Sequence, residues 1–150
     1  MITLAERLET DYKTAMKAQD RLRIETIRLV KAAIQRVAID KRKDAPDDQE
    51  ILQVLAQQVK QRRETVEAAK QATRQDVLTQ ATEELAILNA YLPPQLSEGA
   101  LATLIDEAIQ AVGTNYGQIM KHVMAKAAGA ADGAVVSRLV RDRLSPRPAS

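Results

Sequence analysis

Apolar residues recur every three or four positions along most of this chain, the spacing that places them on one face of an α-helix. Seven stretches with this spacing are separated by capping residues, glycine or proline. They cover residues 4–16, 22–38, 51–69, 77–92, 101–112, 116–124 and 135–144. The pattern therefore predicts an all-α protein of about seven helices.

Short polar residues mark where several of these helices begin. Thr3 is followed by Glu6, and Asp47 by Glu50, at the spacing of a capping box, in which each side chain accepts the backbone N–H of the other residue. Side-chain caps are also expected at Asp20, Ser97 and Asp132. Gly113 is expected to end the fifth helix in the left-handed αL conformation.

The second predicted helix has apolar residues on two sides. One face carries Ile24, Ile27, Val30, Ile34, Val37 and Ala38, and the opposite side carries Leu22, Leu29 and Ala33. A helix that is apolar on two sides is expected to pack between other helices. We therefore place this helix at the centre of the N-terminal unit.

Pro93 and Pro94 divide the apolar pattern in two. Each proline removes a backbone donor, and Pro93 pushes Leu92 towards an extended backbone, so no helix can run through this point. The pattern predicts an N-terminal antiparallel unit of about four helices, a proline-rich hinge, a small C-terminal unit of three helices and a disordered tail. Their bounds are residues 1–92, 93–97, 98–144 and 145–150.

The amino-acid composition limits which residue types can form the core and indicates where in the cell the protein is expected. Hydrophobic residues make up 45% of the chain, but it has three tyrosines and neither Phe nor Trp, so the core must be aliphatic. The absence of cysteine excludes disulfides and thiolate chemistry and is compatible with a reducing cytoplasm. No apolar run approaches the roughly 20 residues of a membrane span, and the first residues lack the pattern of a signal peptide. We expect a cytoplasmic protein without membrane contact.

The residue types do not indicate a catalytic site. His122 is the only histidine, and a single histidine on a helix is usually a surface or boundary residue. No serine stands in a Gly-x-Ser-x-Gly elbow, and Gly129 and Gly133 lack the lysine that a phosphate-binding loop needs. The sequence contains neither grouped zinc ligands nor an acidic calcium loop. We expect no catalytic residue, cofactor or metal.

The cationic residues are better candidates for function. The net charge of +2 permits contact with nucleic acid without requiring it. The C-terminal unit has a local excess of cations, which meet only Asp132 and Asp142 nearby in the sequence. These candidates for contact with backbone phosphates are Lys121, Lys126, Arg138, Arg141 and Arg143. Because no aromatic residues interleave with them, recognition would depend on shape and charge.

A second candidate is a cationic strip on the third helix, which includes Lys60 and Arg63. Glu64 and Glu67 interleave with it, so an ordinary solvated face is the alternative. Arg62 instead falls on the apolar stripe of this helix, where its stem is expected to pack while its head group pairs with a carboxylate. The carboxylates considered for this pairing, and for that of Arg23, are Asp20, Glu83 and Glu84.

Segments along almost the whole chain resemble YqeY proteins, the stand-alone branch of the GatB/YqeY domain family. Each segment is short, and their order along the chain makes the resemblance specific. The segments are LETDYKTAMKAQD (8–20), TIRLVKAAIQRVAID (26–40), VKQRRET (59–65), RQDV (74–77), YLPPQLS (91–97) and ADG (131–133).

The resemblance implies an all-helical protein with a smaller C-terminal helical unit. Related domains form the tail of the GatB subunit of the tRNA-dependent amidotransferase and precede the catalytic core of some glutaminyl-tRNA synthetases, where they are viewed as tRNA-contacting appendages. The resemblance thus implies that this chain is a non-catalytic module associated with tRNA. The alternative is a protein-interaction module that docks on an amidotransferase or synthetase through apolar residues exposed on the short C-terminal helices. Family association also suggests carbon–nitrogen ligase activity with glutamine as amide donor.

The chain departs from the usual family pattern around residues 117–133. Tyr116, Gln118, Lys121, Ala125, Ala128, Ala130 and Ala134 stand where methionine, lysine, glycine, proline, lysine, arginine and lysine are usual. Four cations are therefore missing and only Lys121 is gained. If these positions contact RNA in relatives, binding here is expected to be weaker or displaced towards Arg138, Arg141 and Arg143.

Overall fold

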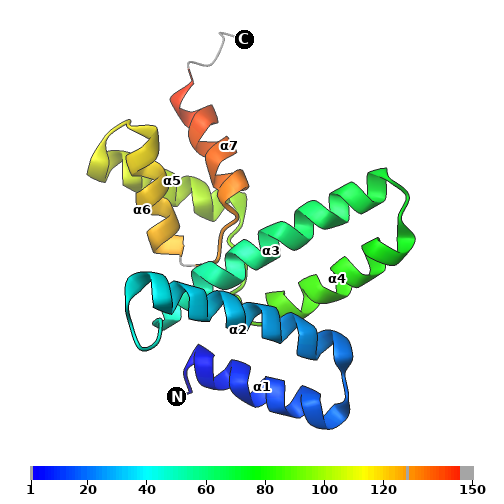
Figure 1. The fold of residues 1–150 in the computed structure, drawn as a ribbon. Coiled ribbons are helices and arrows are strands. Elements are labelled where there is room, and N and C mark those ends of the chain that lie inside the picture. The colour runs from blue at the N-terminus through cyan, green and yellow to red at the C-terminus, as the bar shows by residue number, and fades with distance from the viewer. Residues whose placement is uncertain (1, 128, 146–150) are drawn as a thin grey trace. The chain divides into compact units, whose positions relative to one another are not determined.

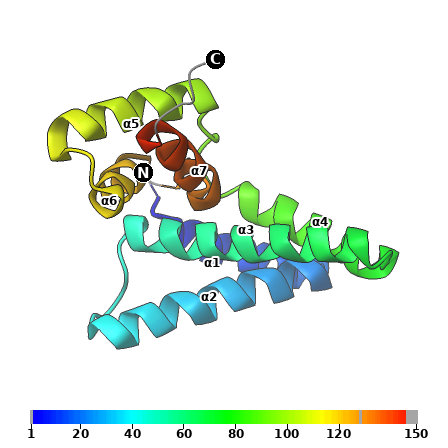
Figure 2. The ribbon, with the colours of Figure 1, turned by 90° about the horizontal axis from the view of Figure 1, so that it is seen from above.

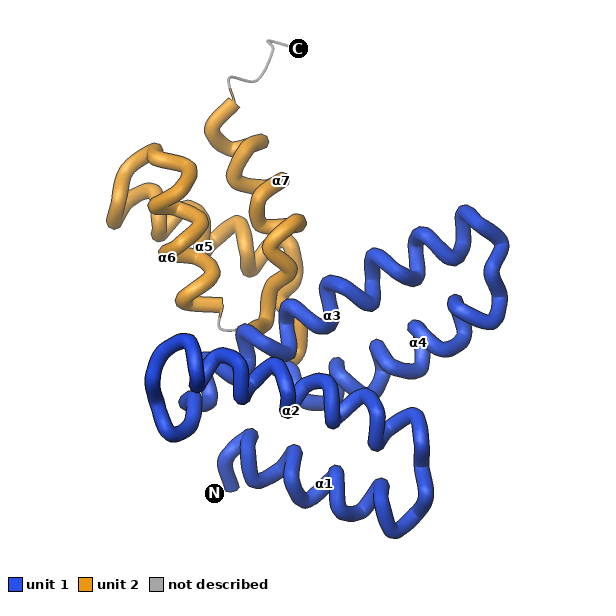
Figure 3. The backbone as a smooth tube through the Cα atoms, viewed as in Figure 1, with its two compact units in different colours: residues 1–93 blue, residues 94–150 orange. Residues whose placement is uncertain are grey.

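The computed structural model describes residues 2–127 and 129–145. Over these residues the chain forms seven α-helices and no strand, which confirms the predicted fold class (Figure 1). The helices are α1 (Leu4–Ala18), α2 (Arg21–Lys41), α3 (Asp48–Gln71), α4 (Gln75–Asn89), α5 (Glu98–Val112), α6 (Tyr116–Ala127) and α7 (Gly133–Leu144). The chain divides into two compact units, residues 1–93 and 94–150 (Figure 3). The predicted tail, apart from Ser145, lies outside the described residues.

Two helical hairpins form the N-terminal unit. α1 and α2 run antiparallel, and α3 and α4 lie side by side in the same way (Figures 1 and 2). α2 contacts α1, α3 and α4. The core that these helices enclose consists of Leu8, Ile27, Val30, Ile51, Val54, Leu55, Val59, Leu88 and Tyr91. As the composition requires, this core is aliphatic apart from one tyrosine.

α2 packs against the other three helices of its unit, as expected, but its second apolar side is not buried throughout. Ile27 and Val30 are each 1% exposed, whereas Leu29 on the opposite side is 54% exposed. The apolar pattern identifies residues that are able to be buried. The three helices that contact α2 leave Leu29 exposed, whereas Ala33 on the same side packs against the core.

Side-chain caps begin the helices as predicted. Thr3 and Glu6 accept each other's backbone N–H, and Asp47 and Glu50 do the same. The caps at Asp20, Ser97 and Asp132 are also confirmed. Gly113 ends α5 at φ 86° and ψ −156°, so its backbone has the positive φ that favours glycine but is not αL as expected.

A charged pair joins the two helices of the second hairpin. Arg62 Nε lies 2.8 Å from Glu84 Oε2, and its Nη1 donates to Gln58 Oε1 at 2.9 Å. The two charged side chains are 13% and 16% exposed. This confirms that Arg62 packs its stem on the apolar stripe of α3 while its head group pairs with α4. Arg23 pairs with Asp20 at 3.4 Å, as also predicted.

The C-terminal unit encloses its own aliphatic core between α5, α6 and α7. That core consists of Leu101, Ile105, Ala108, Ile119, Val123, Ala127, Ala131, Val136 and Val140. The segment before α5 is bonded to the same unit, because the Leu96 N–H donates to the Ala130 carbonyl at 2.8 Å and Gln95 Nε2 donates to the Gly129 carbonyl at 3.1 Å. The end of the predicted hinge is therefore held by the C-terminal unit.

Glu50 is the most buried carboxylate of the described residues, with 8% of its surface exposed. Its Oε2 lies 2.6 Å from Lys41 Nζ and its Oε1 lies 2.5 Å from Lys43 Nζ. The hydrogen bond from Lys41 contributes most to lowering the pKa of Glu50 to about 2, followed by those from Lys43 and the Asp47 backbone. This cluster fixes the connection between α2 and α3.

Replacing Glu50 with glutamine is expected to destabilise the protein at pH 7 and to reduce its sensitivity to acid. Because the pKa of Glu50 falls from 4.5 to about 2 on folding, its contribution is complete above pH 4.5 and is lost as the pH falls towards 2. Urea unfolding at pH 7 and pH 3 measures both effects. Glu64→Gln, at an exposed position of α3, is the control. An equal acid response in E50Q and the unmodified protein would refute this assignment.

Candidate functional site

The outward side of α6 is cationic and has no acidic residue. Ile119, Val123 and Ala127 turn inward and are buried. Outside this buried stripe lie exposed or half-buried residues that we call the α6 face, namely Gly117, Gln118, Lys121, His122, Ala125 and Lys126. Lys121 lies opposite the stripe, and Lys126 lies at its edge. Helix α6 contains neither Asp nor Glu. Among the described residues, Lys121 and Lys126 have no hydrogen-bond or ion-pair partner, so both charges are available to a ligand.

Two of the predicted cations on α7 are engaged within the unit. Arg138 Nη2 donates to Glu98 Oε1, and Arg143 Nη2 donates to Asp106 Oδ1. Asp132 and Asp142 are the acidic residues near these cations in the sequence, and Arg138 also lies 4.0 Å from Asp142, but Glu98 and Asp106 are further partners in space. The missed partners come from α5, which packs against α7 but is distant in sequence.

Arg141 lies between the other two arginines of α7 in the sequence and has a different partner. Its guanidinium carbon is 5.6 Å from the ring centre of Tyr116, at the start of α6. The Tyr116 hydroxyl is 2.6 Å from Ser137 Oγ, which ties the same ring to α7. Because a ring contact leaves the cation uncompensated, Arg141 adds positive charge at the start of α6. The candidate cations without a carboxylate partner are therefore Lys121 and Lys126 on α6 and Arg141 at the contact of α7 with the start of α6.

The cations of the predicted strip on α3 differ in exposure and in pairing. Lys60 is exposed, whereas Arg63 is half-buried and takes part in an interaction within the described structure. Lys70 lies 3.6 Å from Glu67, and Arg74 lies 3.4 Å from Asp76. These contacts fit the alternative of an ordinary solvated face.

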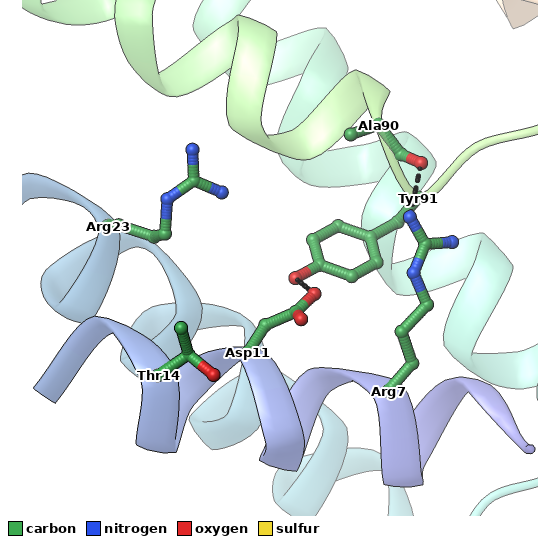
Figure 4. Close-up of a pocket in the computed structure, with 6 residues that line it drawn as sticks. All are labelled: Arg7, Asp11, Thr14, Arg23, Ala90 and Tyr91. Atoms are coloured by element: carbon green, nitrogen blue, oxygen red, sulfur yellow. Dashed lines mark hydrogen bonds between the residues drawn. The ribbon is translucent and has the colours of Figure 1, made fainter. Parts of the chain in front are cut away.

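A pocket of about 250 Å³ opens in the N-terminal unit between α1, the start of α2 and the end of α4 (Figure 4). It is lined by Arg7, Asp11, Thr14, Arg23, Ala90 and Tyr91. Tyr91 is 5% exposed, and its hydroxyl donates to Asp11 Oδ2. Burial is the main cause that raises the pKa of Tyr91, and the hydrogen bond to Asp11 adds to it. Tyr91 is thus a core residue, and its hydroxyl is bonded to a residue 80 positions away in the sequence.

Arg7 completes the pocket on the other side of Tyr91. Its guanidinium carbon lies 4.5 Å from the centre of the Tyr91 ring, and its Nη2 donates to the Ala90 carbonyl at 2.9 Å. The Ala90 carbonyl stands at the end of α4, where the helix dipole favours a cation. This pocket was not predictable from the sequence. The only local signal was the spacing of four residues between Arg7 and Asp11, which usually indicates a surface ion pair.

The described residues lack a metal-binding cluster and a membrane-spanning helix, and they expose few large hydrophobic side chains. In the described part of the chain, no three His, Cys, Asp or Glu side chains come together as a metal site. The described helices include none that is long and apolar enough to cross a membrane. The exposed large hydrophobic residues are Ile2, Met16, Leu29, Ile39 and Tyr116. Only Tyr116 belongs to the C-terminal unit, so the expectation of an exposed apolar set on the short C-terminal helices is wrong.

The family model for YqeY-like proteins matches residues 5–144, which is nearly the whole chain. The chain belongs to the YqeY-like protein family. It is also similar to Altered inheritance of mitochondria protein 41, a mitochondrial protein of Pyrenophora tritici-repentis (strain Pt-1C-BFP). The two are 25% identical over 142 residues, which cover 91% of this chain and 78% of the relative.

The structure places the positions at which this YqeY-like chain departs from the usual family pattern. Gln118 and Lys121, where the family usually has lysine and glycine, both lie on the α6 face. One lysine has thus been exchanged for another on the same side of the helix. Ala130 is buried, Ala134 is exposed on α7, and Ala128 lies outside the described residues. The α6 face keeps two lysines despite the losses elsewhere.

Proposed function

We propose that this chain is a non-catalytic module that binds tRNA through its phosphate backbone and is associated with the enzymes that aminoacylate or amidate tRNA. The observation that carries the proposal is the α6 face, where two lysines have neither an acidic neighbour on their helix nor a partner among the described residues. Unpaired cations on an exposed helix suit phosphate contacts, which depend on charge and not on base sequence.

The positions of the other predicted cations define the extent of the site. Arg141 contributes because its ring contact with Tyr116 leaves its charge uncompensated. Arg138 and Arg143 contribute little while Glu98 and Asp106 hold them. The site is therefore centred on Lys121 and Lys126, and is not displaced towards all three arginines of α7. We further propose a cytoplasmic location, which cell fractionation tests.

Reversing the charge of both lysines on the α6 face tests the proposal. In Lys121→Glu/Lys126→Glu, the affinity for tRNA is expected to fall on the order of tenfold or more at low salt. The negative slope of log K against log salt is expected to become shallower by about 2, because each phosphate contact contributes roughly −0.9. Fluorescence anisotropy with labelled tRNA at several salt concentrations measures both.

The matched control reverses two lysines in the other unit. Lys13 and Lys17 are exposed on α1, and Lys13→Glu/Lys17→Glu changes the net charge by the same amount. If RNA binding depended only on net charge, both double variants would lose affinity equally and the α6 face would not be the site. Circular dichroism shows whether each variant retains its helices.

The ion pairs between α5 and α7 give a second prediction in the opposite direction. Asp106→Asn releases Arg143, so tRNA binding is expected to tighten and the salt slope to steepen by up to about 1. Glu107→Gln removes the same charge from the next position, which has no ion pair with a described residue. It is expected to change binding little, since salt screens exposed charges beyond about 10 Å. Equal effects of the two substitutions in a tRNA titration would show that release of Arg143 is not the cause. The fold should tolerate both, because exposed pairs contribute roughly 0–1 kcal/mol.

A further inference from the structure

Two opposite charges line the pocket beside Tyr91 without neutralising each other. Arg7 and Asp11 lie four residues apart on α1, the spacing at which an arginine and an aspartate usually pair. Among the described residues neither forms an ion pair, because Tyr91 separates them (Figure 4). Its hydroxyl binds the carboxylate of Asp11 and its ring lies against the guanidinium of Arg7. The pocket thus holds the half-buried charges of Arg7 and Asp11, and beside them Arg23, whose charge is paired with Asp20 outside the pocket lining.

Both charged groups retain free hydrogen-bonding capacity. A guanidinium has five N–H donors, of which the Ala90 carbonyl takes one. Asp11 uses Oδ2 for the Tyr91 hydroxyl, and Oδ1 has no hydrogen bond with a described residue. Thr14, one turn further along α1, also has an unbonded hydroxyl in the described structure. The pocket can therefore offer donors at Arg7 and acceptors at Asp11 and Thr14.

We propose that this pocket binds a small zwitterion of the α-amino acid class, with its carboxylate at Arg7 and its ammonium group at Asp11 and Thr14. A simple anion would meet the carboxylate of Asp11, and a simple cation would meet the guanidinium of Arg7. A ligand that carries both charges satisfies both groups, and a volume of about 250 Å³ limits it to a small molecule. Arg23, paired with Asp20, lines the pocket as well. The site lies in the N-terminal unit and does not depend on the proposed RNA site of α6.

The test is a titration of the full chain with the free proteinogenic amino acids, followed by amide chemical shifts in NMR. At least one amino acid is expected to produce saturable shifts that centre on Arg7, Asp11, Thr14 and Tyr91. Its N-acetylated and carboxamide derivatives, which each lack one charge, are expected to bind about tenfold or more weakly. These derivatives leave the protein unchanged, so the comparison does not depend on the folding of a variant.

Protein variants give the complementary test. Asp11→Asn and Arg7→Gln are each expected to weaken the binding of that amino acid about tenfold or more. Lys13→Gln, at an exposed position of α1 outside the pocket, is expected to leave it unchanged. The proposal is overturned if no amino acid gives saturable shifts at the pocket, or if the charge-lacking derivatives bind as well as the parent. In that case Arg7 and Asp11 serve only to hold Tyr91. The RNA titrations are unaffected by either outcome.

Discussion

Tyr91→Ala is expected to destabilise the N-terminal unit by about 3–5 kcal/mol, the range for truncating a buried aromatic side chain. Tyr91 is 5% exposed and belongs to the core that all four helices of this unit share. The substitution leaves a cavity and removes the partner of two charged groups, because Arg7 lies over its ring and Asp11 accepts its hydroxyl. Urea unfolding followed by circular dichroism measures the loss.

Tyr91→Phe separates the two parts of this effect. It keeps the ring and removes the hydroxyl, so its expected cost is about 1.5–3 kcal/mol, the range for a hydrogen bond to a charged group. If Tyr91→Ala were no more costly than Tyr91→Phe, the ring would not be packed in the core as described. Circular dichroism spectra before unfolding show whether both variants retain their helices.

Ile119→Ala is expected to destabilise the C-terminal unit by about 2–5 kcal/mol. Ile119 is 0% exposed and lies on the inner side of α6, against α5 and α7. Since each unit has its own core, hydrogen exchange in the full chain should accelerate in residues 94–145 and remain slow in the core of residues 2–93. RNA affinity should fall with it, because the α6 face needs a folded α6.

Gln118→Ala is the control for this prediction. Gln118 is an exposed member of the α6 face, one residue before Ile119, so its truncation should change stability by less than about 0.5 kcal/mol. Acceleration of hydrogen exchange throughout both units in Ile119→Ala would contradict the description of two separate cores.

The sequence predicted the features of this fold that depend on neighbours along the chain. Helix positions follow from apolar spacing, and caps such as Thr3 and Asp47 follow from residues three apart. The pairing of Arg62 was also predictable, because a charged residue on an apolar stripe must find a partner. Each of these inferences uses a regular repeat or a local physical requirement.

Features that join distant segments were not predictable in the same way. The exposure of Leu29 depends on which helices cover α2, and the pairing of Arg143 with Asp106 depends on how α7 packs on α5. The bond between Tyr91 and Asp11, and with it the pocket, joins residues 80 positions apart. A single sequence contains no repeat that specifies such contacts. Only the structure therefore distinguishes the predicted cations that are paired from those that are unpaired.

We propose that unpaired cations of this chain bind the phosphate backbone of tRNA. The most direct test titrates the full chain with labelled tRNA at a series of salt concentrations and uses polyglutamate as an unrelated acidic polymer. We expect saturable binding with a slope of log K against log salt of about −2 or steeper, and a clear preference for tRNA over polyglutamate. Absence of tRNA binding at low salt, or equal affinity for polyglutamate, would contradict the claim.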